Sequence, residues 1–209
     1  MNEEKLKSQM TSGMMWKFAE RFAAQGVSFV VSMVLARILM PEDYGAVAII
    51  NIFITIADVF LSSGLNTSLI QKKDADDLDF STIFYLNLGL CVILYLILFC
   101  TAPYIAKAYD MPILKSAIRV FALRLPVSAF QVIQVTYISK KMQFKKFFFA
   151  TITGTLFSAV VGVGMALKGF GVWALIGQYL TNTAVNTVML WATVKWVPKK
   201  MFSFKAVIP

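Results

Sequence analysis

Histidine is absent from this chain of 209 residues, and cysteine occurs only twice. Without histidine the chain lacks the side chain that most often binds metals or transfers protons near neutral pH. Cys91 and Cys100 are nine residues apart in one apolar run, too far apart on a helix for a disulfide, and we expect them to pack as small apolar groups. The sequence also shows no nucleophile–base pair, phosphate-binding glycine loop or metal-ligand cluster. It therefore gives no basis for catalysis or for a resident cofactor.

Charged residues make up only 15% of the chain, whereas hydrophobic residues make up 58%. Soluble domains are about 45–50% apolar, and several runs here reach the roughly 20 apolar residues that cross a bilayer. We therefore predict an integral membrane protein. The net charge of +9 does not indicate a nucleic-acid partner, because the lysines cluster in loops between apolar runs. The N-terminus lacks the short apolar core and cleavage site of a signal peptide, so we expect the first helix to be retained.

The apolar runs predict an all-α bundle of six transmembrane helices, at about 12–39, 42–65, 80–106, 112–138, 147–167 and 172–196. Thr11 or Ser12 is a candidate N-cap for the first helix, and Pro41 suits the first turn of the second. Pro126 predicts a kink in the fourth helix. Residues 1–11 then form a cytoplasmic N-terminal segment, 12–196 the helical lobe, and 197–209 a basic linker.

Lysine distribution predicts the orientation of the bundle. With the N-terminus in the cytoplasm, four basic residues fall in the outer loops: Arg37, Lys107, Lys115 and Lys168. Twelve lysines fall in the inner loops and tails: Lys5, Lys7, Lys72, Lys73, Lys140, Lys141, Lys145, Lys146, Lys195, Lys199, Lys200 and Lys205. This asymmetry follows the positive-inside rule and predicts that both termini are cytoplasmic. The acidic run 74–79 lacks the glycine and distal glutamate of an EF-hand, so we interpret it as a loop with a helix cap.

Polar side chains recur at helical spacing inside the apolar runs. One face of the first helix carries Lys17, Arg21, Gln25, Ser28 and Ser32, and one face of the second carries Asn51, Thr55, Asp58 and Ser62. Glu20 lies three residues from Lys17 and could pair with it. Arg21 and Asp58 lie roughly 13 Å and 10 Å from the inner ends of their helices, so they are at similar depth and could pair across the hairpin. Such a pair either only stabilises packing or exchanges a proton or a partner during a functional cycle.

Arg119 and Arg124 lie in the fourth helix, and helices three to six hold no acid at the depth of these arginines. An arginine near mid-membrane implies an anionic ligand, a missing partner or an aqueous vestibule, and its planar fork suits phosphate or pyrophosphate. Arg119 is also near enough to the interface to contact lipid phosphate. The amide side chains of the bundle could bind sugar hydroxyls or could equally bond helix to helix. A row of small residues in the fifth helix predicts close helix packing: Thr151, Thr155, Ser158 and Gly162.

Six short motifs, in this order and spacing, carry a resemblance to a known family. They are LARILMPEDYG (35–45), SGL with LIQKKD (63–65 and 69–74), STIFYLN (81–87), KMQFKK (141–146), GFGVWAL (169–175) and WVP (196–198). The chain resembles bacterial polysaccharide transporters of the multidrug/oligosaccharidyl-lipid/polysaccharide exporter superfamily. It is similar to the lipopolysaccharide O-antigen and colanic-acid exporter branch. Members of that family have about twelve to fourteen spans, so the chain resembles the N-terminal lobe alone.

The resemblance implies a flippase that moves undecaprenyl-pyrophosphate-linked oligosaccharide across the bacterial inner membrane by alternating access, often coupled to protons or sodium. It implies further partners: membrane lipid, a second lobe or second copy, and polymerase or glycosyltransferases. A multidrug cation exporter or a non-transporting scaffold subunit are the alternatives. The charge pattern, not the resemblance, selects the expected substrate-binding residues: Arg21, Arg119, Arg124, Gln25, Asn51, Gln131, Gln178 and Asn182. It selects three expected coupling residues: Asp58, Lys17 and Glu20.

Overall fold

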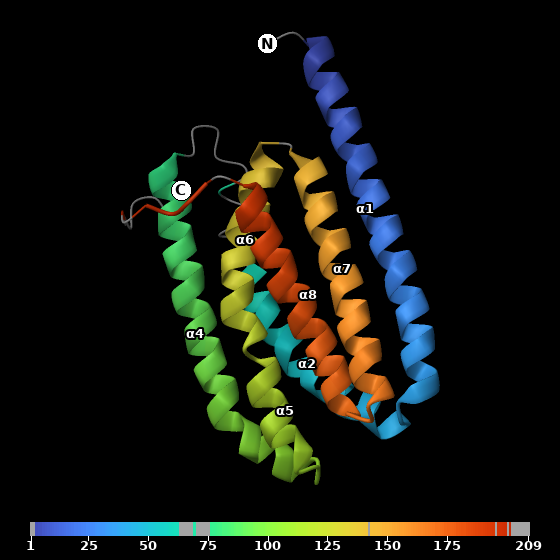
Figure 1. Ribbon diagram of the computed structural model, residues 1–209. Helices are drawn as coiled ribbons and strands as arrows, with labels where there is room; N and C mark the ends of the chain where they lie inside the picture. The colour runs from blue at the N-terminus through green and yellow to red at the C-terminus, as the bar shows by residue number, and fades with distance from the viewer. Residues whose placement is uncertain are drawn as a thin grey trace.

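The computed structural model describes residues 3–62, 69, 76–141, 143–194, 196–199 and 201. Every regular element in these ranges is a helix, as predicted (Figure 1). The helices are α1 (Glu3–Ile38), α2 (Pro41–Ser62), α4 (Asp77–Ala108), α5 (Ile113–Phe121), α6 (Arg124–Lys140), α7 (Phe144–Leu167) and α8 (Val172–Thr193). Parts of the family motifs (63–65 and 70–74) and several inner-loop lysines lie outside the described residues: Lys72, Lys73, Lys195, Lys200 and Lys205.

The helices alternate in direction along the chain, except that α6 continues in the direction of α5 (Figure 1). Figure 1 shows α1 beginning at the upper end, where the α6–α7 turn lies and α8 ends. The α1–α2, α4–α5 and α7–α8 turns lie at the opposite end (Figure 1). This arrangement places Lys141 and Lys168, in the α6–α7 and α7–α8 turns, at opposite ends of the bundle. The end that faces the cytoplasm stays a prediction.

Within the part of the chain that the structure describes, five segments are long and apolar enough to cross a membrane: Ser12–Ile38, Pro41–Leu61, Asp77–Ala108, Ile113–Lys140 and Phe144–Leu167. The sixth predicted span, α8, has 22 residues but is not among these five segments, and polar side chains such as Gln178, Asn182 and Asn186 interrupt its apolar residues. Its position explains how this polarity is tolerated, because α8 packs against α7, α6, α5 and α2 (Figure 1). Neighbouring helices rather than lipid therefore surround much of its polar surface, and six spans remain a prediction.

The helix ends lie within three residues of the predicted ones, except for the start of α1. α1 begins at Glu3, so the prediction that it begins at Thr11 or Ser12 is wrong. Residues 3–11 hold no proline or glycine and are mostly strong helix formers, which lets the helix extend. Pro41 is the first residue of α2, as predicted. Asp76 caps α4 by accepting a hydrogen bond from the Asp79 N–H at 3.0 Å, which confirms a helix cap in the acidic run.

The predicted kink of the fourth helix is present and separates α5 from α6. Pro126 has no N–H to donate to the carbonyl of Ala122, four residues earlier, and its ring crowds that oxygen. The Leu125 N–H instead bonds the Ala122 carbonyl at 2.9 Å, in a tighter turn. The helix is interrupted at Ala122 and Leu123, four and three residues before the proline. Arg124 is consequently the first residue of α6.

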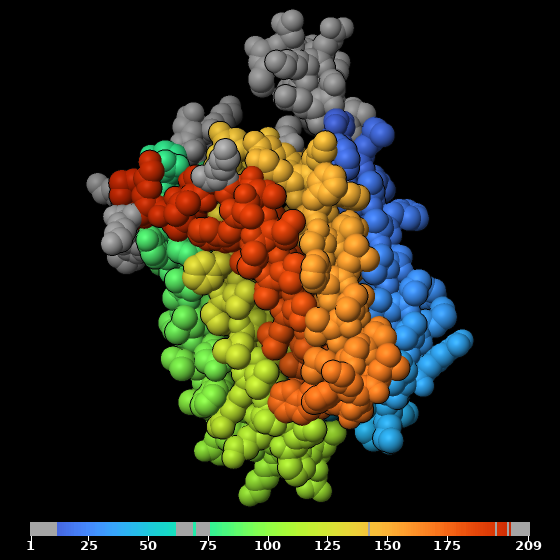
Figure 2. Space-filling model, viewed as in Figure 1, coloured from blue at the N-terminus to red at the C-terminus, as the bar shows by residue number. Residues whose placement is uncertain are grey.

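Small residues allow α7 and α8 to approach closely. A Cβ on Gly162 would lie 2.9 Å from Cβ of Gln178, and a Cβ on Gly154 would lie 3.2 Å from the Asn182 carbonyl oxygen. Ser158 lies between the two glycines and is buried. The predicted packing role of the small-residue row is therefore confirmed. α1 lies at the edge of the bundle and packs mainly against α7, which separates it from α8 (Figure 2).

The segment that follows α8 binds back onto the ends of α4 and α6. The Trp196 ring stacks on Tyr137 with centroids 6.0 Å apart, and its Nε1–H donates to Asp77 at 3.0 Å. Lys199 Nζ forms an ion pair with the same Asp77 carboxylate at 2.6 Å. The Gln134 amide donates to the Trp196 carbonyl at 3.0 Å. These contacts hold residues 196–199 across two helices that are distant in sequence.

Candidate functional site

An ion pair inside the bundle connects α2 to the start of α6. Arg124 Nη2 lies 3.1 Å from Asp58 Oδ2, and the two side chains are 27% and 38% exposed. Asp58 lies one turn before the end of α2, and the helix break before Pro126 places Arg124 at the first position of α6. The charges are thus partly desolvated and held between separate helices. Such a position strengthens their attraction relative to a surface pair.

The predicted pairing of Asp58 with Arg21 is wrong. α1 packs against α7, whereas α2 packs against α4, α5 and α8, so the two helices of the hairpin diverge. The rise per residue predicts depth in the membrane, but it does not predict which helix lies beside the acid at that depth. The fourth predicted helix supplies the partner instead.

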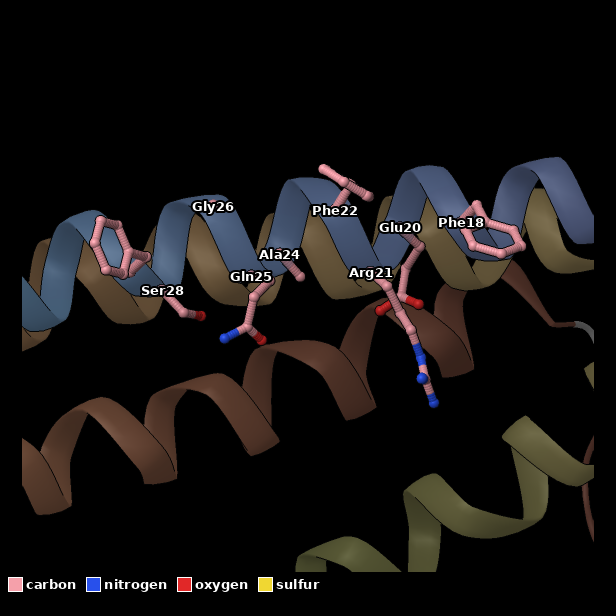
Figure 3. Close-up of a pocket in the computed structure, with 9 residues that line it drawn as sticks. Phe18, Glu20, Arg21, Phe22, Ala24, Gln25, Gly26 and Ser28 are labelled. Carbon is pink, nitrogen blue, oxygen red and sulfur yellow. The ribbon is translucent and has the colours of Figure 1, made fainter.

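Arg21 lies on an open polar face of α1. Figure 3 shows Arg21, Gln25 and Ser28 pointing to the same side of the helix, as their spacing predicts. They line a cavity of about 760 Å³ together with Glu20 and with aromatic side chains that include Phe18. The arrangement combines donors and a charge with apolar surface. It could contact a ligand that has both polar and apolar parts.

Lys17 and Glu20 lie at the α1–α7 junction. Lys17 Nζ lies 4.9 Å from the centre of the Phe144 ring, within the range of a cation–π contact. Lys17, Glu20 and Arg21 share the lining of a second cavity of about 410 Å³, to which α7 contributes Phe147. Among the described residues, no salt bridge joins Glu20 to Lys17, so the predicted pair is not formed.

The amide side chains of α8 lie in the seam with α7. Asn182 Nδ2 donates to Ser158 Oγ at 3.3 Å, and the base of Gln178 packs against Gly162. These contacts match the expectation of helix-to-helix bonding. Asn51 on α2 and Gln131 on α6 are partly buried. A role for these four residues in substrate binding stays a prediction.

Arg119 lies away from the Arg124–Asp58 pair. Its Nε–H donates to the Phe99 carbonyl at 3.2 Å, and its Cζ lies 4.1 Å from the centre of the Phe99 ring. The structure therefore does not gather the predicted residues into one site. Most of them lie at the pair, on the α1 face, in the α7–α8 seam or in the α4–α5 region, while Asn51 and Gln131 lie apart on α2 and α6.

Two features of these places were missed by reasoning from the sequence. One is the pairing of Arg124 with Asp58, and the other is the use of Phe99 as a platform for Arg119. The position of Arg124 two residues before Pro126 was a usable signal, because proline disrupts the helix in the preceding turn. Nothing in the sequence marks Phe99 among its many apolar neighbours. Within the described residues, no group of three or more acidic or cysteine side chains is placed to hold a metal ion.

Comparison with known proteins identifies the family of the chain. Residues 34–208 match the family described as polysaccharide biosynthesis protein. The chain belongs to this family. The match covers more than half of the chain and confirms the resemblance that the motifs carry.

Several curated relatives are similar to nearly the whole chain. The succinoglycan biosynthesis transport protein ExoT of Rhizobium meliloti (strain 1021) is 26% identical over 95% of this chain and 40% of its own length. The lipopolysaccharide biosynthesis protein WzxC of Escherichia coli (strain K12) is 26% identical over 88% of this chain and 37% of its own. The teichuronic acid biosynthesis protein TuaB of Bacillus subtilis (strain 168) is 23% identical over 96% and 42%. The chain thus spans about two fifths of the length of these relatives. No solved structure matches it.

Proposed function

We propose that this family member is one helical lobe of a flippase that moves undecaprenyl-pyrophosphate-linked oligosaccharide across the bacterial inner membrane. The observation that carries the proposal is the Arg124–Asp58 pair, a partly exposed guanidinium at a helix break inside the bundle. Similarity to a succinoglycan transport protein and to a lipopolysaccharide biosynthesis protein supports polysaccharide export as the setting.

The chemistry of arginine supports binding of a pyrophosphate. The contact to Asp58 uses Nη2 of Arg124, and a guanidinium has five N–H donors in a planar fork. Phosphate oxygens match this fork in a bidentate manner, so an incoming pyrophosphate could compete with Asp58 for Arg124. A displaced Asp58 would then be free to take up a proton or a cation. The exchange of partners would couple the substrate to an ion, which is the proposed role of Asp58.

The α1 face supplies the surface for the remainder of the substrate. Arg21 and Gln25 point into the larger cavity, where they could bind phosphate and sugar hydroxyls (Figure 3). Lys17 and Glu20 border the adjoining cavity and are further candidates for coupling. Large apolar side chains that also border this cavity, including Phe22 and Phe29, are exposed on α1. We propose that a second lobe, or a second copy of this chain, faces this surface across the substrate path and that the two halves rock in alternating access.

The proposed setting is the inner membrane, with six spans and both termini in the cytoplasm. Membrane lipid and the lipid-linked oligosaccharide are then direct partners, and polysaccharide polymerase and glycosyltransferases are expected neighbours in the biosynthetic machine. A cation exporter of the same superfamily would need a more acidic cavity than the α1 face offers, where Glu20 is accompanied by Arg21.

The test uses the complete polypeptide in a strain that lacks its oligosaccharide exporter. Undecaprenyl-linked oligosaccharide remaining on the cytoplasmic side is measured for the wild type, Arg124→Ala, Asp58→Asn and the exchanged pair Asp58→Arg/Arg124→Asp. We expect the wild type to clear the intermediate and Arg124→Ala to retain most of it. If Arg124 binds substrate, the exchanged pair restores protein abundance without restoring clearance.

The opposite results have distinct meanings. Clearance by the exchanged pair would show that the ion pair only stabilises packing. Failure of the wild type, in a strain where a known exporter works, would remove the flippase proposal. Increased drug resistance would then favour a multidrug exporter, and co-purification with glycosyltransferases without clearance would favour a scaffold subunit.

A further inference from the structure

We infer that the exposed face of α5 forms a phosphate-binding notch, separate from the Arg124–Asp58 pair. The notch is a cavity of about 290 Å³ lined by Pro112, Lys115, Ser116, Arg119 and Val120. Two of these side chains are cations, and none is an acid. The ligand chemistry that fits is a phosphate group, carried either by a phospholipid headgroup or by a soluble phosphate. The inference goes beyond the transport proposal and does not depend on it.

Arg119 is preorganised for this role by α4. Its Nε–H donates to the Phe99 carbonyl at 3.2 Å, and the guanidinium lies over the Phe99 ring, 4.1 Å from its centre. These contacts hold the plane of the guanidinium while leaving its terminal nitrogens available, since no described carboxylate forms a salt bridge with Arg119. A fixed fork with free donors binds phosphate at a lower entropic cost than a mobile side chain.

The packing of α5 fixes the second cation on the same side. Leu114, Ala117, Ile118 and Phe121 are fully buried, so α5 cannot rotate to move its opposite face away from the notch. Lys115 lies four residues before Arg119 and therefore on the same face of the helix. Ser116 Oγ donates to the Ile113 carbonyl at 3.1 Å, which leaves its lone pairs rather than its proton toward the notch. The donors to an anion are consequently Lys115 and Arg119.

Like charges at this spacing repel each other, and a bound anion would relieve the repulsion. α5 follows directly on the α4–α5 turn at one end of the bundle (Figure 1). Helix ends in membrane proteins lie near the lipid headgroups, where basic side chains meet phosphate. A phospholipid bound here would tie α5, and with it the α5–α6 break, to the surrounding bilayer.

Two binding measurements on the purified chain distinguish the sources. In detergent free of phospholipid, native mass spectrometry counts bound phosphatidylglycerol, with a galactosyl diacylglycerol as the lipid without phosphate. Calorimetry with inorganic phosphate measures the soluble ligand. The variants are Lys115→Gln, Arg119→Gln and the control Lys168→Gln, which removes an exposed lysine in the α7–α8 turn at the same end of the bundle (Figure 1). Lys115→Gln removes an exposed side chain and keeps the Arg119 platform, so it tests the notch even if Arg119→Gln folds poorly.

We expect Lys115→Gln and Arg119→Gln each to weaken binding of phosphatidylglycerol about tenfold, as for the loss of a charged hydrogen bond, with no change for Lys168→Gln. Notch-dependent binding of inorganic phosphate alone would support the soluble source. Equal binding by Lys115→Gln, Arg119→Gln and Lys168→Gln in both measurements would overturn the inference, as would equal retention of the galactolipid and phosphatidylglycerol by the wild type.

Discussion

Arg124 and Asp58 form an ion pair that is neither fully buried nor on the surface, with side chains 27% and 38% exposed. Removing one charge leaves the other partly desolvated without a partner, whereas removing both leaves no such charge. Losing one charge of this pair therefore costs more than losing one charge of a surface ion pair, because water solvates the remaining charge only in part. The energetics of the pair can therefore be measured separately from its role in transport.

We predict that Asp58→Asn and Arg124→Gln each lower the free energy of unfolding by about 1–3 kcal/mol. The double variant should lose less than the sum of the two, with a coupling energy of about 1 kcal/mol. Denaturation of the detergent-solubilised protein measures the free energy of unfolding of the wild type, the two single variants and the double variant. Arg37→Gln, which removes an exposed charge at the end of α1, is the control. Additive losses would contradict the pairing.

At the scale of an element, the α7–α8 seam depends on the absence of side chains at particular positions. Gly162 faces the base of Gln178, where a Cβ would lie 2.9 Å from the neighbouring Cβ. Gly164 lies on the same helix, yet a Cβ there would meet nothing within 4 Å. Gly162 and Gly164 therefore differ in whether a side chain of α8 lies beside them.

We predict opposite effects for alanine at these two positions. Gly162→Ala should lower the free energy of unfolding by about 1–3 kcal/mol, because the crowded atoms belong to the base of Gln178 and cannot swing away. Gly164→Ala should be neutral or stabilising by up to about 1 kcal/mol, because alanine favours the helix. Thermal unfolding of the two purified variants side by side measures the difference. Equal stability would show that the seam is looser than described.

At the scale of the whole molecule, the bundle has two chemically different ends. The end that holds the α6–α7 turn carries the lysine cluster Lys140, Lys141, Lys145 and Lys146, whereas the opposite end carries basic residues that are spread over three separate turns: Arg37, Lys107, Lys115 and Lys168 (Figure 1). Basic loops are retained on the cytoplasmic side during insertion, so the lysine-rich end should face inward. The orientation then follows for every helix, because the predicted spans alternate in direction.

We predict that Lys168→Cys, in a background with Cys91 and Cys100 replaced by serine, reacts with a membrane-impermeant thiol reagent in intact spheroplasts. Lys141→Cys should react only after the membrane is permeabilised. Both lysines are exposed in turns, so accessibility within the protein does not limit either reaction. Labelling of Lys141→Cys in intact spheroplasts would reverse the assigned orientation.

Much of the fold follows from signals that act within a few residues. The start of α2 at Pro41 and the break before Pro126 follow from the missing N–H and the fixed ring of proline. The capacity of α7 for close helix packing follows from small residues at helical spacing. The polar face of α1 follows from its periodicity (Figure 3). These features require no knowledge of distant segments, and the sequence by itself determined them.

Only the tertiary structure decided which helices lie beside each other. It paired Asp58 with Arg124 instead of Arg21, because α1 packs against α7 whereas α2 packs against α4, α5 and α8. It placed Gln178 and Asn182 in a seam between helices, and it set Phe99 beneath Arg119. Periodicity and rise per residue place a side chain by height and face within its own helix. The lateral neighbour depends on how all the helices pack together, and that choice is made by the whole bundle.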